Sequence, residues 1–157
     1  HSLGLTSTGQ LHAWGGDEAG QCSCAPTGRW IAVSAGGYHS LGVTAAGELR
    51  AWGDDGCGRC SGAPPLSPGE RWLAASAGGG HSLGLTSSGQ LHAWGDDRYG
   101  QVSGVPELKM GERWLAVSAG AGHSLGLNAA GTVHAWGQGS CGQASEAASD
   151  SLRGLPR

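Results

Sequence analysis

The chain has 157 residues, enough for one domain that buries roughly two-thirds of its unfolded surface without help from disulfides or metal ions. It holds 32 glycines, 7 tryptophans and no phenylalanine, and its net charge is -3. This charge argues against binding of nucleic acid by this segment. No run of about 20 apolar residues is present, so we expect no membrane-spanning helix and no membrane partner.

One pattern recurs four times along the chain. The dipeptide His-Ser returns at intervals of 38, 42 and 42 residues, and Trp-Gly keeps these intervals. The residues that mark the pattern, for which we expect structural roles, are His1, His39, His81, His123, Trp14, Trp52, Trp94 and Trp136. Such self-similarity is typical of repeat architectures. We place the units at about 1–29, 30–71, 72–113 and 114–145, and treat 146–157 as a polar tail or linker.

The third unit shows the expected elements in chain order. Residues 72–78 predict a first strand, and the alternating runs around Leu83 and Leu91 predict two more, since successive side chains of a strand point to opposite faces. Gly89 ends the connection between these two runs, where a tight hairpin needs a positive φ. A short fourth strand is expected around residues 101–105. No window has helical periodicity.

Three or four short strands in every 40 residues predict an all-β fold, either a β-propeller or a stacked β-solenoid. Small residues at alternate positions, such as Gly84 and Ala93, would let neighbouring sheets approach each other. The leading unit lacks the first strand, and the tail has no apolar alternation that could supply it. We therefore expect an open array with uncovered sheet edges, to be covered by more repeats of the same chain or by another protomer.

The units resemble the regulator-of-chromosome-condensation (RCC) repeat over about residues 1–145. The residues that carry the resemblance in the third unit are Ala77-Gly78, His81-Ser82-Leu83, Leu85, Gly89, Leu91, Trp94-Gly95 and Gly100-Gln101. The resemblance favours the propeller and implies about three and a half to four blades, a fragment of a seven-bladed or longer array. Where the RCC pattern prefers Asn after Trp-Gly-x, the chain has Asp17, Asp55, Asp97 and Gly139.

The family that the units resemble includes an exchange factor for the small GTPase Ran, domains of ubiquitin ligases, plant ultraviolet-B photoreceptors and many scaffolds. The photoreceptor branch is disfavoured because its Gly-Trp-Arg-His-Thr element is missing. We expect a non-catalytic protein–protein interaction scaffold, not an enzyme. The alternatives are nucleotide exchange on, or regulation of, a Ran-like small GTPase, and the substrate-recruiting domain of a larger ubiquitin ligase.

Recognition is expected in the loops, because the recurring residues have packing or turn roles. The candidate partner-binding residues are Arg98, Tyr99, Glu107, Lys109 and Met110, and residues 64–68 form a further candidate loop. The sequence contains no Gly-x-Ser-x-Gly elbow and no phosphate-binding Gly-x-x-x-x-Gly-Lys loop. We therefore predict no catalytic residue, no metal ligand and no cofactor.

The recurring histidines precede the central strand of each unit, and we expect each to bond a backbone carbonyl within its own blade. A metal ion held by four histidines would need four separate blades to aim at one point. The acidic pairs Asp17-Glu18, Asp54-Asp55 and Asp96-Asp97 are interpreted as solvated turn residues, with an acidic rim for a basic partner as the functional alternative.

Cys57 and Cys60 have the spacing of a redox motif, yet their positions in the repeat are packing positions. A disulfide between them stays open as an alternative. Five cysteines, an odd number with no regular pairing, favour a reducing compartment. We expect an intracellular protein, cytoplasmic or nuclear.

Overall fold

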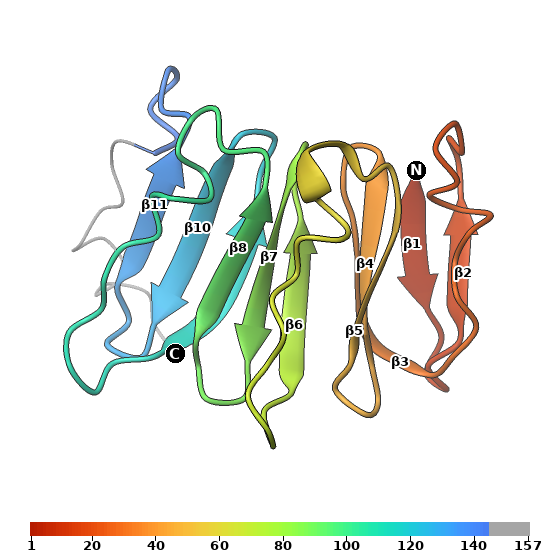
Figure 1. Cartoon of the computed structure of the whole chain (residues 1–157), viewed down its shortest axis with the longest axis horizontal. Coiled ribbons are helices and arrows are strands. Elements are labelled where there is room, and N and C mark those ends of the chain that lie inside the picture. The colour runs from red at the N-terminus through yellow and green to blue at the C-terminus, as the bar shows by residue number, and fades with distance from the viewer. Residues whose placement is uncertain (145–157) are drawn as a thin grey trace, which may run out of the picture.

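The computed structural model describes residues 1–144, which form four antiparallel β-sheets standing side by side in chain order (Figure 1). The first sheet has two strands, β1 (Ser2–Leu5) and β2 (Leu11–Trp14). The others have three each: β3 (Trp30–Ala35), β4 (His39–Thr44) and β5 (Leu49–Gly53); β6 (Trp72–Ala77), β7 (His81–Thr86) and β8 (Leu91–Gly95); β9 (Trp114–Ala119), β10 (His123–Asn128) and β11 (Val133–Gly137). A single 3-10 turn, η1 (Gly56–Gly58), follows β5. The tail expected at 146–157 lies outside the described residues.

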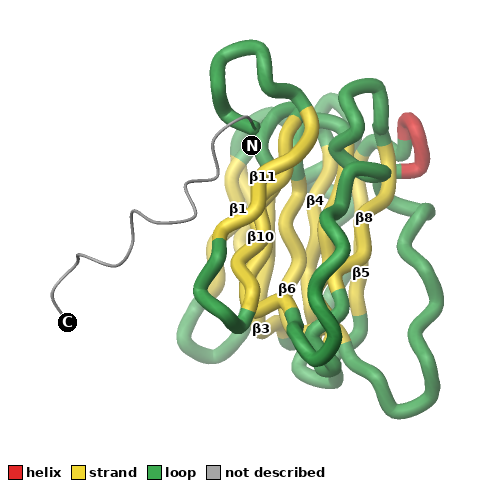
Figure 2. Tube along the Cα trace, turned by 90° about the vertical axis from the view of Figure 1, so that its left-hand side faces the viewer, coloured by secondary structure: helices red, strands yellow, loops and turns green. Residues whose placement is uncertain are grey.

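Figure 2 shows the strands as a central layer with connections at both ends. Among the described residues, no helix is long and apolar enough to cross a bilayer. The described elements are eleven strands and one 3-10 turn, which confirms the predicted all-β fold, and the sheets stand next to one another as blades of a partial β-propeller.

The predicted hairpin of each unit is confirmed. In the third unit β7 pairs with β8, with Leu85 opposite Leu91, and Gly89 adopts a φ of 82° in the turn. The amide of Gly89 donates to the carbonyl of Thr86 at 2.9 Å, which closes the turn. The first strand predicted at 72–78 is also confirmed as β6, which pairs with the other side of β7.

The fourth strand expected around residues 101–105 is wrong, because residues 101–104 form a turn. The side chain of Asp97 accepts hydrogen bonds from the amides of Val102 and Ser103, at 2.8 and 2.9 Å. The amide of Gly104 donates to the carbonyl of Gly100. These local bonds use the backbone groups that a strand would present to a neighbour.

Each sheet has one face of leucines and one face of tryptophans. The leucine face of the third unit, with Leu83 and Leu85, packs against Trp114 and Trp136 of the fourth unit in a single buried cluster. The second and third units meet through an equivalent cluster. Within one sheet, the ring of Trp72 lies over Gly84, where a Cβ would come within 2.2 Å of the ring. The glycine of the His-Ser-Leu-Gly pattern therefore makes room for the tryptophan of its own sheet.

The two terminal sheets leave one face of each kind uncovered by residues 1–144. Trp14 is 55% exposed, whereas Trp52, Trp94 and Trp136 are buried. At the other end, Leu125 and Leu127 are only half-buried and line a shallow apolar hollow of about 120 Å³. The described part of the array thus ends in a tryptophan face on one side and a leucine face on the other.

Candidate functional site

The recurring histidines link neighbouring units rather than bonding inside their own blade, so the expected bond is corrected. His39 Nε2 lies 2.9 Å from the hydroxyl of Ser82 in the next unit. Ser82 Oγ donates to the carbonyl of Arg59 at 2.8 Å, and Trp94 Nε1 donates to the same carbonyl. The equivalent pairs join His1 to Ser40 and His81 to Ser124. The carbonyl is thus reached through a serine of the next blade.

This network determines which ring nitrogen of His39 carries the hydrogen. Because the serine hydroxyl gives its own hydrogen to a carbonyl, it accepts one from Nε2–H of His39. The other ring nitrogen, Nδ1, is buried beside Gly36 and has no hydrogen-bond partner among residues 1–144. Burial, together with the smaller effect of the positive charge of Arg59, lowers the pKa of His39 to about 4. The imidazole is neutral at pH 7 and serves as a link between blades.

An aspartate three residues after the repeated tryptophan caps the turn in each of the first three units. Asp55 Oδ1 accepts the amides of Cys60 and Ser61, at 2.8 and 2.9 Å, as Asp97 does in the next unit. These bonds hold the pKa of the Asp55 carboxyl below its ordinary value. Asp17 makes the same bonds in the first unit. The interpretation as exposed turn residues therefore fits Asp17, Asp55 and Asp97.

A hollow of about 480 Å³ opens at the rim of the second, third and fourth units, where β5 and β8 end. We call it the rim hollow. Its lining comes from all three units and includes Tyr38, Asp54, Arg59, Asp96, Arg98, Tyr99 and Gln138. Both tyrosines of the chain take part, and both are about half exposed. The rim hollow is the described surface at which aromatic and charged side chains of several units converge.

Two ion pairs shape the rim hollow. Arg98 forms a two-pronged contact with Asp96, with Nε and Nη2 within 3.0 Å of the carboxylate oxygens. These bonds from Arg98 hold the pKa of Asp96 low. Arg59 lies 3.7 Å from Asp54, and its Nε donates to the carbonyl of Gly56. The charges balance, so this part of the rim is not an acidic surface.

The five candidate binding residues are split between two ends of the fold. Arg98 and Tyr99 line the rim hollow. The connection from β8 to β9 then runs to the opposite end of the sheets (Figure 1), where the amide of Trp114 bonds the carbonyl of Gly89. Glu107, Lys109 and Met110 lie on that later part of the connection, and Met110 is fully exposed. They do not join Arg98 in one site.

Asp96 is only 8% exposed, so its interpretation as a solvated turn residue is wrong. Tyr38 and Arg59 were not among the candidate residues predicted from the sequence. Their signal is a break in the repeat: Tyr38 stands where the next units have Gly80 and Gly122. Arg59 stands where the other units have glutamine, at Gln21, Gln101 and Gln143. Gln21 and Gln101 are buried, and the side chain of Arg59 is only 13% exposed. Departures from an internal repeat are thus the best guide to this surface.

The cysteines are free thiols, and the alternative of a Cys57–Cys60 disulfide is absent from the structure. Burial raises the pKa of the Cys60 thiol to about 11, and its Sγ lies 3.4 Å from the carbonyl of Asp54. Cys57 is exposed in a turn with a φ of 60°. Within residues 1–144, no group of three or more His, Cys, Asp or Glu side chains gathers closely enough to hold a metal ion.

Several solved structures share this fold. Yeast RCC1 (Prp20) bound to Kap60 matches at 21% identity with a TM-score of 0.72, over 87% of this chain and 41% of that one. Prp20p from Saccharomyces cerevisiae matches at 21% identity and a TM-score of 0.73, over 87% and 43%. Human WBSCR16 matches at 23% identity and 0.68, over 86% and 44%. The chain spans about two-fifths of the length of these structures, and the likeness concerns the fold.

The comparison with curated proteins gave no match. The family profile described as the regulator of chromosome condensation (RCC1) repeat matches three segments, residues 30–59, 74–101 and 114–143. These segments include the His-Ser and Trp-Gly pairs of three units, which the structure places in the links between blades. The chain belongs to the RCC1 repeat family.

Proposed function

We propose that this chain is a non-catalytic scaffold that binds a protein partner at the rim hollow. The observation that carries the proposal is the convergence of Tyr38, Arg98 and Tyr99, all of them positions at which the repeat pattern varies, on one hollow. Tyrosine and arginine are enriched at protein interfaces because they combine a large contact area with hydrogen bonding. The recurring residues, by contrast, are used in links between blades.

The partner surface should match the balanced charge of the rim. Arg98 is exposed at its guanidinium although it pairs with Asp96, so it can add a bond to an incoming carboxylate. We expect a partner that presents an acidic side chain beside an apolar one. The acidic side chain would bond Arg98, and the apolar one would lie between Tyr38 and Tyr99.

Site-specific crosslinking tests this function. A photoreactive residue replaces Tyr99 in one version of the full chain and Met110, at the other end of the sheets, in a matched version. We expect one partner to crosslink from position 99 and not from position 110, and Arg98→Glu to reduce the yield about ten-fold or more. Equal crosslinking from both positions, or none from position 99, would contradict the proposal.

A second candidate is regulation of a Ran-like small GTPase. It is favoured by the fold shared with Prp20p, whose structure was reported with binding properties to Gsp1p and histones. The measurement is GDP release from a Ran-like GTPase with and without the chain. An acceleration abolished by Arg98→Glu would support this candidate over a passive scaffold.

The substrate-recruiting domain of a ubiquitin ligase is a further alternative. It is tested by asking whether a protein that crosslinks from position 99 is ubiquitinated.

We further infer that the two terminal faces are covered in the working protein, by more repeats of the chain or by another protomer. The support is the pairing of leucine and tryptophan faces between all adjacent three-stranded sheets. The five free thiols support an intracellular location, cytoplasmic or nuclear.

A further inference from the structure

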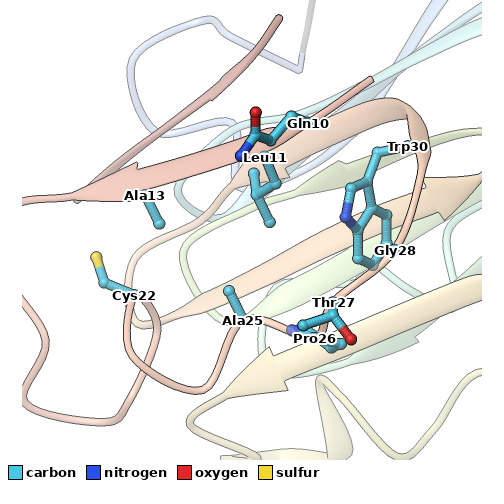
Figure 3. Close-up of a pocket in the computed structure, with 9 residues that line it drawn as sticks. All are labelled: Gln10, Leu11, Ala13, Cys22, Ala25, Pro26, Thr27, Gly28 and Trp30. Carbon is cyan, nitrogen blue, oxygen red and sulfur yellow. The ribbon is translucent and has the colours of Figure 1, made fainter. Parts of the chain in front are cut away.

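A second hollow, of about 390 Å³, opens in the first unit between β2 and the connection to β3. We call it the first-unit hollow. Figure 3 shows Leu11 and Ala25 pointing toward one another across it, with Trp30 at one end. Its lining residues are Gln10, Leu11, Ala13, Cys22, Ala25, Pro26, Thr27, Gly28 and Trp30. None of these side chains carries a charge at pH 7, so the hollow suits an uncharged, apolar group.

The chain fills the equivalent position in the next two units with leucines of its own. Leu66 packs against the cluster between the second and third units, as do Leu49 and Ala63, the counterparts of Leu11 and Ala25. Leu108 packs in the same way between the third and fourth units, beside Leu91 and Val105. Two units thus show which side chain this site accepts.

The first unit lacks this leucine because its connection is shorter. Three residues separate Pro26 from Trp30, whereas seven separate Pro64 from Trp72. The chain resumes the same path at Arg29, whose carbonyl accepts the amide of Ala45, just as the carbonyl of Arg71 accepts that of Ser87. Four residues are missing in the first unit, at the place where the other units carry their leucine.

We propose that the first-unit hollow is a docking site for a leucine side chain of a protein partner, presented on a short extended segment. The partner supplies in trans what residues 65–69 and 107–111 supply in cis. The size of the group is set by the two leucines that occupy the equivalent sites, and its apolar character by the uncharged lining. The site is separate from the rim hollow and does not depend on the function proposed for it.

The probe is a capped peptide with the sequence of residues 107–111, Glu-Leu-Lys-Met-Gly. Added to the full chain, it should perturb the NMR signal of the Trp30 indole in a saturable way, with a dissociation constant on the order of a millimolar for so small a ligand. The same peptide with Leu→Ala should bind about ten-fold more weakly, because three buried carbons are lost. Absence of saturable binding, or equal binding of both peptides, overturns the proposal.

Substitution at Gly28 supplies matched variants of the protein. Its Cβ would meet only the ring of Trp30, at 3.8 Å, and its φ is one that other residues adopt. Gly28→Leu should fill the hollow and reduce peptide binding at least ten-fold, whereas Gly28→Ala adds a single carbon and should reduce it by a smaller factor. If Gly28→Leu folds and binds the peptide as the parent does, the site is not the one proposed.

A graft tests the same site without a peptide. Residues 27–28 are replaced by the sequence of residues 107–112, which restores the length found in the third unit, and a second version carries Ala in place of the leucine. The leucine version should melt about 3 °C or more above the alanine version, since only the former fills the hollow. Equal melting temperatures of two folded grafts would show that the hollow does not accept leucine.

Discussion

The Nε2 atom of His39 and the hydroxyl oxygen of Ser82 lie 2.9 Å apart, although the two residues are 43 positions apart in the chain. Both side chains are fully buried. The same contact joins His81 to Ser124 at the next junction. A polar link that repeats between blades therefore runs beside the leucine and tryptophan clusters, and it sets the register in which one sheet stacks on the next.

Replacing Ser82 by alanine should destabilise the fold by about 1–3 kcal/mol. The substitution leaves the Nε2–H of His39 buried without an acceptor, and an unmet buried donor loses its hydration without compensation. Urea unfolding followed by tryptophan fluorescence measures the change. Ser2→Ala is the matched control, because the Ser2 side chain is exposed and has no hydrogen-bond partner among residues 1–144. Equal stability of Ser82→Ala and the parent would show that the link contributes nothing.

The stability of the fold should decrease as the pH is lowered from about 6.5 to about 4. In the unfolded chain His39 has its ordinary pKa of 6.5, whereas in the fold the pKa is about 4. Between these values the unfolded chain binds a proton that the folded chain does not, which favours unfolding by about 3 kcal/mol at the acidic end. Above about pH 6.5 His39 is neutral in both the folded and the unfolded chain, so the fold keeps its full stability there.

The variant His39→Gln separates this effect from the carboxylates. Glutamine can still donate to Ser82 but has no proton to gain, so the slope of unfolding free energy against pH should become shallower between pH 6.5 and 4. Asp55 and Asp96 have lowered pKa values, and their contribution is lost only below the ordinary value of 3.8. An unchanged slope in the variant would assign the pH dependence to other groups.

The sequence predicted those features that depend on neighbours within one unit. The two-residue alternation around Leu85 and the glycine at position 89 were enough to place the hairpin. The partner of His39 was predicted wrongly because it lies in the next unit, and no pattern within one repeat reports which blades meet. The rim hollow itself was not predicted, although Arg98 and Tyr99 were named as candidate binding residues, since its shape depends on connections that converge from three units.

The first-unit hollow shows a different limit. The shorter connection before Trp30 is visible in the sequence, but its consequence is not. Only the structure shows that Leu66 and Leu108 pack against the core from the longer connections, so that a connection four residues shorter lacks a side chain that packs there. The shorter connection indicates a candidate binding site only when it is compared with the packing of the two longer connections.

Replacing Gly84 by alanine should destabilise the fold by about 1–3 kcal/mol. The added methyl group would lie 2.2 Å from the Trp72 ring, which is held between sheets and cannot move away freely. Gly28→Ala is the control, since its Cβ has ordinary contacts only, and we expect a change below about 0.5 kcal/mol. Thermal unfolding of both variants measures the difference, and equal melting temperatures would argue against close packing of Trp72 on Gly84.

Replacing Asp97 by alanine should loosen the turn at residues 100–104 and reduce stability by about 1 kcal/mol. The carboxylate accepts two backbone amides, those of Val102 and Ser103, and water replaces it only in part. Asp97→Asn keeps an acceptor oxygen and should retain most of the stability. Hydrogen exchange at the amides of Val102 and Ser103 is the direct measurement. Faster exchange in Asp97→Ala, but not in Asp97→Asn, is the expected pattern, and unchanged exchange in both would contradict it.

The uncovered terminal faces should make the 157-residue chain associate head to tail. The leucine face around Leu125 and Leu127 is of the kind that covers a tryptophan face in the interior of the array, and Trp14 is an uncovered tryptophan.

Leu127→Asp and Trp14→Asp each remove one of these faces, so each variant alone should sediment as a monomer. A mixture of the two retains one intact face of each kind and should form a one-to-one dimer that does not grow, because a heterologous contact with both outer faces blocked cannot propagate. Analytical ultracentrifugation distinguishes these species. Self-association of either variant alone would indicate a contact between like faces, and a monomeric parent chain at millimolar concentration would show that the two faces do not bind each other.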